Sequence, residues 1–255
     1  MSLLSINVLS KRFDDAVVLC DVRLTLRPRE AVAIVGASGC GKSTLLRIAA
    51  RLDKKFAGWV RVGKNERSSA GDIAALFQEP RLFPWLTTAQ NVAYAAGASG
   101  APQADARALA LLEEVGLADR AHALPRQLSA EQAQRAALAR ALYARPKVLL
   151  LDEPFATLDA FTRRQLQDLL STLSRRHGIT LLFATHDVDE AVLLADRVVV
   201  LGGESRGITS DIAIGLPHPR DRRDPNLALL RGQVLDALDA AHVVHARPWP
   251  TRQSA

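Results

Sequence analysis

The sequence lacks two features that would place it in or beyond a membrane. None of its apolar runs approaches the roughly 20 residues that a membrane-spanning helix requires. The N-terminal residues 1–7 contain no basic region and no apolar core of signal-peptide length. We therefore expect a soluble chain that is not itself exported.

Cysteine is scarce as well. The 255 residues include two cysteines, Cys20 and Cys40, and their spacing is unlike that of a metal site. A disulfide at Cys40 would obstruct the glycine-rich loop described below. The cysteines therefore indicate a reducing cytosol.

Aromatic residues make up 5% of the chain, although its net charge is +6. Most of the positive charge comes from arginines scattered through predicted helices, with a late cluster at Arg220, Arg222 and Arg223. No basic face interleaved with aromatic side chains is present, as a nucleic-acid-binding surface would require. The composition disfavours a nucleic-acid partner and favours a solvated basic surface near a membrane.

The most informative stretch runs from residue 36 to residue 44 and matches G-x-x-x-x-G-K-S/T. An apolar strand pattern at 31–35 precedes it and a helix pattern at 44–50 follows. Glycines allow the backbone N–H groups to point into one concavity, and the helix N-terminus adds positive charge. A glycine-rich turn without function is the alternative, and the flanking strand and helix disfavour it. The predicted nucleotide-binding residues are Gly36, Ala37, Ser38, Gly39, Cys40, Gly41, Lys42, Ser43 and Thr44.

Within this loop, Lys42 is expected to reach the β- and γ-phosphates and Ser43 to ligate Mg²⁺. The Cys40 thiol lies near a helix N-terminus, which favours some thiolate character. An inert small side chain at Cys40 is an equally good interpretation.

Two carboxylates follow a buried strand pattern at 148–151. Ligands of parallel sheets bind at the carboxyl ends of the strands, so Asp152 and Glu153 should emerge beside the phosphate loop. We expect Asp152 to hold Mg²⁺ and Glu153 to orient or deprotonate the attacking water. An acidic turn that only caps the strand is the alternative.

A third strand pattern, at 179–184, ends in Thr185 and His186. A lone histidine is more often structural, but this position favours contact with a γ-phosphate. Asp187 and Glu190 have the spacing of a capping box at a helix start.

The remaining patterns predict an α/β fold with a mixed core sheet. Strand patterns at 3–9, 22–26 and 58–62 predict a small antiparallel sheet, and 73–77 another core strand. Helix patterns at 88–124, with Pro102 at a start and Gly116 at an end, predict a helical insertion, and a longer helix runs from Ser129 to residue 144. The run at 196–201 is the last predicted core strand. A helix at 227–240 and a frayed tail at 245–255 follow.

This ordered set of motifs resembles the ATPase subunits of ABC transporters over roughly residues 3–205. The residues that carry the resemblance are the phosphate loop, Gln78, the 128–132 segment, the 150–154 segment, the 156–159 segment and His186. Arg81 to Trp85, the 137–142 and 158–163 segments and Thr185 to Asp187 strengthen it. Within the family the chain is similar to the nitrate/sulfonate/taurine import group, most of all to an aliphatic-sulfonate importer ATPase.

The resemblance implies a P-loop NTPase core of ABC ATPase type with a small antiparallel β-subdomain and an inserted helical subdomain. We expect an ATPase domain at 1–205, with the insertion at about 80–145, and a C-terminal extension at 206–255. The subunit would bind ATP and Mg²⁺ and form a homodimer on the cytoplasmic face of the inner membrane. It would energise a transmembrane permease, and act indirectly with a substrate-binding protein, without binding nucleic acid.

The resemblance also implies roles for individual residues. Phe13 would stack on adenine, although an aromatic there could equally pack in the core. Gln78 would contact Mg²⁺ and relay to the permease, and His186 would hold the γ-phosphate. Ser129 would act on the nucleotide of the opposite subunit and Asp159 would lie at the dimer seam. The metal set is therefore Ser43, Gln78 and Asp152, and the catalytic set Lys42, Gln78, Glu153 and His186.

The chain departs from the family at its signature segment, Leu-Ser-Gly-Gly-Gln, where both glycines are replaced: Ser129 is followed by Ala130, Glu131 and Gln132. Ser129 and Gln132 still make a good helix cap, and Glu131 complements the helix dipole. The same carboxylate would face a γ-phosphate at about 7 Å across a closed dimer, at a cost on the order of 5 kcal/mol. We expect Glu131 to turn to solvent or to a nearby arginine, with a reduced rate of hydrolysis.

Two other functions fit parts of the sequence. An ATP-binding regulatory or weakly hydrolysing subunit would follow if the altered signature prevents dimer closure. A DNA-associated ABC-type ATPase is disfavoured, because the roughly 85 residues between phosphate loop and signature leave no room for a long coiled coil.

Overall fold

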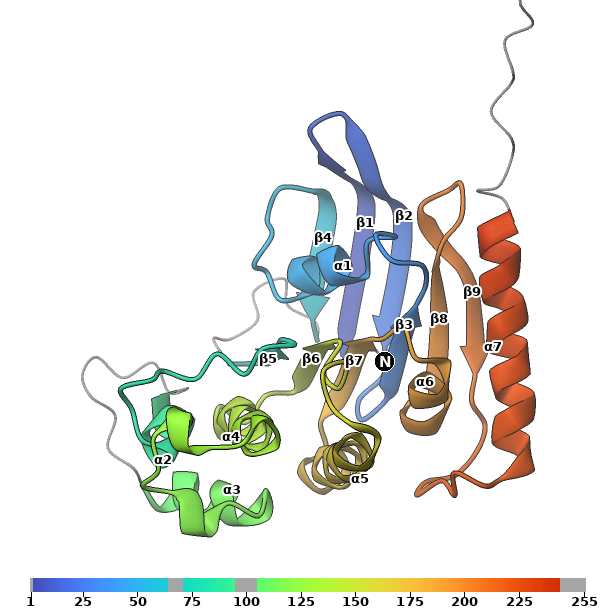
Figure 1. The fold of residues 1–255 in the computed structure, drawn as a ribbon. Coiled ribbons are helices and arrows are strands. Elements are labelled where there is room, and N and C mark those ends of the chain that lie inside the picture. The colour runs from blue at the N-terminus through green and yellow to red at the C-terminus, as the bar shows by residue number, and fades with distance from the viewer. Residues whose placement is uncertain (1, 64–70, 95–104, 244–255) are drawn as a thin grey trace, which may run out of the picture.

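In the computed structural model, which describes residues 2–63, 71–94 and 105–243, the core is a six-stranded mixed sheet (Figure 1). Five strands are parallel, and the sixth, β9, is antiparallel to β8. In spatial order the strands are β5 (Ile73–Leu76), β6 (Val148–Asp152), β7 (Thr180–Ala184), β3 (Ala31–Val35), β8 (Arg197–Gly202) and β9 (Gly207–Ala213). The mixed α/β core expected from the sequence is confirmed.

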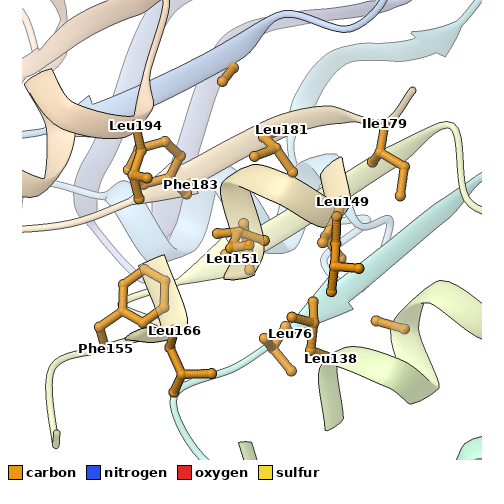
Figure 2. Close-up of a cluster of buried hydrophobic side chains, with 14 of the residues drawn as sticks. Leu76, Leu138, Leu149, Leu151, Phe155, Leu166, Ile179, Leu181, Phe183 and Leu194 are labelled. Atoms are coloured by element: carbon orange, nitrogen blue, oxygen red, sulfur yellow. The ribbon is translucent and has the colours of Figure 1, made fainter. Parts of the chain in front are cut away.

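The central strands are apolar because both faces of the sheet are covered. Every residue of β3 and of β7 is buried. Alternate residues of these strands point to opposite faces of the sheet. Ala33 and Phe183 belong to a first cluster of buried apolar side chains on one face, and Ile34 and Leu182 belong to a second cluster on the other face. Figure 2 shows the first cluster, in which Leu149, Leu151, Leu181 and Phe183 of the sheet lie among side chains of the covering helices. This rigid sheet fixes the loops at its edge.

The last strand corrects one expectation. The run at 196–201 was expected to be the final core strand, but β9 follows and pairs with β8 from Arg197 to Gly202. It begins two residues past the predicted boundary at 205, so the core sheet continues into the predicted C-terminal extension. Its exposure alternates, as in an edge strand, which left no continuous apolar run to recognise.

The expected antiparallel sheet is present as β2–β1–β4. It comprises β1 (Leu4–Phe13), β2 (Ala16–Leu26) and β4 (Ala57–Val62). Its apolar side chains join the second cluster, together with those of α1 (Lys42–Ala49), which follows the phosphate loop. This sheet therefore packs over the same face of the core as α1.

The helical subdomain lies beside β5 at one end of the core sheet (Figure 1). It contains α2 (Thr88–Ala93), α3 (Ala106–Glu114), two single 3₁₀ turns (Ala118–Arg120 and Pro125–Gln127) and α4 (Ala130–Tyr143). Side chains of Thr87, Asp105 and Ser129 cap α2, α3 and α4. Gly116 follows the end of α3 with a φ of 71°, as expected for a helix stop. Pro102 lies outside the described residues.

Three further helices cover the first cluster. They are α5 (Ala160–His177), α6 (Val188–Leu194) and α7 (Pro225–Val243). In Figure 1, α7 runs along β9 at the end of the sheet opposite the helical subdomain. The predicted tail at 245–255 lies outside the described residues. In the described ranges, no helix is both long enough and apolar enough to cross a membrane.

Candidate nucleotide site

Three strands of the core sheet end at the same level and deliver the predicted site residues to one edge. In the register of the sheet, Ala184 of β7 lies opposite both Asp152 of β6 and Ile34 of β3. Because these strands are parallel, the residues that follow them emerge side by side. The phosphate loop after β3, Asp152 with Glu153, and His186 therefore belong to one site.

The phosphate loop requires glycine at its two ends. A side chain at Gly36 would place its Cβ 2.2 Å from the carbonyl oxygen of Leu201. Gly41 has a φ of +106° as the N-cap of α1, and a Cβ there would meet Leu19 at 2.6 Å. The loop thus lies close against neighbouring backbone and side chains, and its fold depends on residues without a Cβ.

Lys42 is drawn into the loop rather than extended into solvent. Its side chain is buried, and Nζ donates hydrogen bonds to the carbonyl oxygens of Gly36 (2.8 Å) and Ala37 (3.0 Å). The ammonium group therefore lies within the curve of the loop, beside the N-terminus of α1. This is the place where the loop would hold phosphate oxygens.

Ser43 and Asp152 meet across the base of the site. The Ser43 hydroxyl donates a 2.9 Å hydrogen bond to Oδ1 of Asp152. Burial raises the pKa of the Asp152 carboxyl, and the Ser43 hydrogen bond opposes that shift. A hydroxyl and a carboxylate are hard oxygen donors of the kind that Mg²⁺ prefers, so this pair fits the magnesium site that the sequence predicts.

Glu153 and His186 form the second pair. Oε2 of Glu153 lies 3.4 Å from Nδ1 of His186, whose side chain is 64% exposed. Glu153 has a φ of +46°, a conformation that costs a non-glycine residue about 1–2 kcal/mol. The Glu153 N–H donates to the carbonyl oxygen of Ala184 at 2.9 Å, which holds the strained residue beside the end of β7. Backbone strain of this type is concentrated at functional sites.

The remaining predicted residues lie at the margins of this centre. Gln78 is exposed and lies two residues past the end of β5, the strand next to β6. Phe13 ends β1 and is 51% exposed, with Lys11 Nζ 4.3 Å from its ring centroid. Asp159 caps α5 by accepting hydrogen bonds from the N–H groups of Phe161 (2.9 Å) and Thr162 (3.1 Å). Within the described residues, none of these three side chains forms a hydrogen bond or ion pair with the phosphate loop.

The signature segment forms the expected helix cap. The Ser129 hydroxyl accepts from the Gln132 N–H at 3.1 Å, and the Gln132 side chain accepts from the Ser129 N–H at 3.0 Å. Ala130 begins α4. The carboxylate of Glu131 turns along the helix to Arg135, as the sequence led us to expect of a nearby arginine.

Two expectations for individual side chains are wrong. Burial is the largest influence on Cys40 and raises the pKa of its thiol, so the expected thiolate character is not favoured. The capping box at α6 is incomplete: Asp187 accepts from the Glu190 N–H at 3.1 Å, but the Glu190 carboxyl is buried, with Oε1 unpaired, instead of reaching back to the cap.

Sequence reasoning missed three polar residues beside the site. Lys11 is buried under Phe13 and forms an ion pair with Asp53 at 2.8 Å. Arg163 of α5 forms an ion pair with Asp187 at 3.3 Å. Glu190 and Arg163 both line a small cavity beside His186. The available signal for Glu190 was an acidic residue among apolar residues of a short helix.

Comparison with known proteins identifies the family to which the chain is similar. Residues 19–156 match the family described as ABC transporter. The chain is 52% identical to the aliphatic sulfonates import ATP-binding protein SsuB 1 of Pseudomonas syringae pv. syringae, over 95% of this chain and 99% of that protein. It is 51% identical to the protein of the same name from Xanthomonas axonopodis pv. citri, over 95% and 97% of the two chains.

A solved structure is similar over most of the chain. It is the dimeric, post-hydrolysis state of the ATP-binding cassette MJ0796, bound to ADP and phosphate. The TM-score is 0.69 at 29% identity, and the match covers 84% of this chain and 100% of the other. The expected ABC ATPase type of the core is thereby confirmed.

Proposed function

The chain belongs to the ABC transporter family, and we propose that it is the ATP-hydrolysing subunit that energises an importer of aliphatic sulfonates. The observation that carries the proposal is the meeting of the phosphate loop, the Ser43–Asp152 pair and the Glu153–His186 pair at one edge of the core sheet. The choice of substrate rests on the 52% identity to a named sulfonate import protein over nearly the whole of both chains.

In the proposed reaction, the loop amides and Lys42 bind the β- and γ-phosphates of ATP and offset their negative charge. The chain would exchange the present Lys42 hydrogen bonds to the carbonyl oxygens of Gly36 and Ala37 for bonds to phosphate oxygens. The ammonium group is thus already held where it is needed. Little reorganisation of the protein is required on binding.

Ser43, Asp152 and Gln78 would hold Mg²⁺. The bound ion would supply further positive charge at the β- and γ-phosphates. The Ser43–Asp152 hydrogen bond sets two of these donors side by side before the ion binds. Ionised Asp152 is the form that would ligate it, although burial raises the pKa of this carboxyl.

Glu153 would orient the attacking water and accept its proton, and His186 would hold the γ-phosphate. The 3.4 Å separation of Glu153 Oε2 and His186 Nδ1 brings the base and the phosphate-holding group together. The left-handed backbone at Glu153 and its bond to Ala184 fix the direction of the carboxylate.

Two copies of the chain would act together. The solved neighbour is dimeric, and the ends of α4 and α5 that carry Ser129 and Asp159 are exposed. We place Ser129, with Ala130, Glu131 and Gln132, against the nucleotide of the opposite subunit, and Asp159 at the seam between the subunits. A subunit that binds ATP but hydrolyses it only weakly is not favoured, because Glu131 is already neutralised by Arg135.

The membrane partner would be a permease, with a substrate-binding protein acting through it, and the subunit would be peripheral on the cytoplasmic face of the inner membrane. Trp85 is 72% exposed beside Phe83, whose ring centroid lies 5.5 Å away. An exposed aromatic of this size favours a protein contact. We place a short helix of the permease against this pair.

The proposal is tested by reconstituting the full chain in lipid vesicles with the permease and the substrate-binding protein of its own transporter. We expect MgATP-dependent uptake of an isotope-labelled alkanesulfonate, with phosphate released in proportion. Uptake of nitrate in preference to alkanesulfonate would overturn the substrate assignment. Hydrolysis without any uptake would overturn the transport assignment.

A further inference from the structure

A small, partly open cavity lies beside the two catalytic side chains of the proposed site. Its walls include Glu153, His186, Thr185, Arg163 and Glu190. The cavity has room for about one water molecule. It therefore joins the proposed base and phosphate-holding residue to two ionisable side chains, Arg163 and Glu190, that the proposed reaction does not use.

Two buried polar atoms of this wall have no hydrogen-bond partner within the described residues. They are Oε1 of Glu190 and Nε of Arg163. Glu190 is 5% exposed. Buried polar atoms are nearly always paired, so two unpaired atoms in one cavity wall mark residues that the fold does not place for stability alone.

Asp187 links the same two residues directly. Its Oδ1 accepts from the N–H of Glu190 at 3.1 Å, and its Oδ2 lies 3.3 Å from Nη1 of Arg163. Its own N–H donates to the Thr185 hydroxyl at 3.0 Å. The residue after His186 is therefore held from three directions.

Arg163 extends this network to a second functional loop. Its Nη2 donates to the carbonyl oxygen of Leu158 at 3.1 Å, one residue before Asp159. The guanidinium group thus connects the loop that leads to the proposed dimer seam with the turn that carries His186. We call Arg163, Asp187 and Glu190 the bracket.

We propose that Arg163 and Glu190 are positioning residues for ATP hydrolysis: with Asp187, they fix the His186 turn relative to Glu153 and to the Asp159 loop. The inference rests on the proposed function, since it assigns these residues to the same reaction. Neither residue touches the phosphates in this arrangement. They act through His186 and Glu153.

Burial, more than the surrounding charges, favours the neutral form of Glu190. Asp187 lies on its own helix, and Glu153 and His186 face it across the cavity. Arg163 and Gln167 approach from α5, Thr185 from the preceding loop, and Arg222 bonds to Gln167 at 2.9 Å. Asp189 is exposed and pairs with Arg231 of α7.

Burial, reinforced by Asp187, raises the pKa of Glu190 to about 8, so at neutral pH its protonated carboxyl can donate a hydrogen bond as well as accept one.

The test compares Glu190→Gln, Glu190→Ala and Arg163→Ala in the full chain, measuring kcat and KM for MgATP from pH 6 to pH 9.5. Gln keeps a neutral donor and acceptor, so we expect kcat at pH 7 within about twofold of the original chain. Ala removes both, and a misplaced catalytic group costs up to about 100-fold, so we expect Glu190→Ala and Arg163→Ala to lower kcat by at least about tenfold with KM little changed. The control is Leu194→Ala, a buried residue of the same helix outside the cavity, which should lower the melting temperature but not kcat.

The pH profile separates positioning from simple support of the fold. In the unmodified chain, kcat should decline as pH rises through about 8, when Glu190 ionises beside Asp187. Glu190→Gln should remove that decline.

An unchanged profile in Glu190→Gln, or a kcat in Glu190→Ala equal to that of Leu194→Ala, would overturn the inference. If Glu190→Ala does not fold, the Glu190→Gln profile still decides. Turnover in the unmodified chain with no effect of the variants refutes the bracket alone, whereas no turnover in the unmodified chain refutes the proposed function and the bracket with it.

Discussion

The carboxylate of Glu131 forms an ion pair with Arg135, one helical turn further along α4. Oε1 of Glu131 lies 2.6 Å from Nη2 and 2.9 Å from Nε of Arg135. Arg135 is itself fixed by the carbonyl oxygen of Val115 at 3.1 Å. The negative charge that replaces a signature glycine is therefore paired and turned along the helix.

This pairing leads to a reciprocal mutational test. Arg135→Gln releases Glu131 toward the nucleotide of the opposite subunit, and repulsion of a few kcal/mol should lower ATPase activity by about tenfold or more. Adding Glu131→Gln to that variant should restore activity. Arg120→Gln, an exposed arginine of the same subdomain, is the control. Replacing both Ala130 and Glu131 by glycine should raise activity above that of the unmodified chain. If Glu131→Gln does not restore the activity of Arg135→Gln, and the double glycine variant is no more active than the unmodified chain, then Glu131 does not approach the nucleotide.

Lys42 should dominate the affinity for nucleotide. Hydrogen bonds to charged groups contribute about 1.5–3 kcal/mol, so Lys42→Ala should weaken ATP binding by about 10- to 100-fold. Isothermal titration calorimetry measures this change, with Lys54→Ala, an exposed lysine outside the loop, as control. Equal affinities of the two variants would contradict the assignment of Lys42.

Phe13 should select for the adenine ring. Lys11 lies 4.3 Å from the centroid of the Phe13 ring and is anchored by Asp53 and by the carbonyl oxygen of Lys55, so the ring is held in place while half exposed. Stacking on a base contributes about 1–3 kcal/mol. Phe13→Ala should therefore weaken ATP binding by at least about fivefold, and Phe13→Trp should not. Trp59→Ala, in a strand of the same sheet, is the control.

Glu190 should make the free energy of unfolding depend on pH. Its pKa is raised to about 8 in the folded chain, from an ordinary value near 4.5. The folded state therefore holds a proton that the unfolded state has lost between these values, and stability falls as pH rises from about 4.5 to about 8. Glu190→Gln should remove this fall, gaining at most about 5 kcal/mol over the original chain by pH 9.

Urea unfolding at pH 5, 7 and 9 measures the effect of Glu190→Gln without nucleotide. Glu204→Gln, an exposed residue, is the control and should follow the unmodified chain. Parallel stability curves for Glu190→Gln and the unmodified chain would show that Glu190 is ionised in the folded state at neutral pH.

The parts of the site that could be predicted from sequence are those set by short-range rules. A glycine-rich loop between a strand and a helix typically binds phosphate. A carboxylate at the end of a buried parallel strand must emerge at the edge of the sheet where ligands bind. The Ser43–Asp152 bond is the direct consequence of these two rules. The turn of Glu131 to Arg135 was also expected, because residues four apart on a helix are neighbours.

The parts that could not be predicted depend on tertiary surroundings. β9 is recognisable as a strand only beside β8, because an edge strand with alternating exposure has a weak pattern of its own. The Asp187–Glu190 spacing is the same whether the glutamate caps its helix or is buried, and packing against α5 decides the outcome. At Cys40, burial outweighs the helix terminus and reverses the expected pKa shift.

The most direct test of the account is to measure MgATP binding and phosphate release for the unmodified chain and for Glu153→Gln. Removing a general base typically costs about 10²- to 10⁴-fold in rate, while the amide keeps the shape of the site. We expect both chains to bind MgATP with similar affinity in calorimetry, and only the unmodified chain to release phosphate at an appreciable rate. No heat of binding in either chain, or equal rates of phosphate release in both, would contradict the assignment of this sheet edge as an ATPase site.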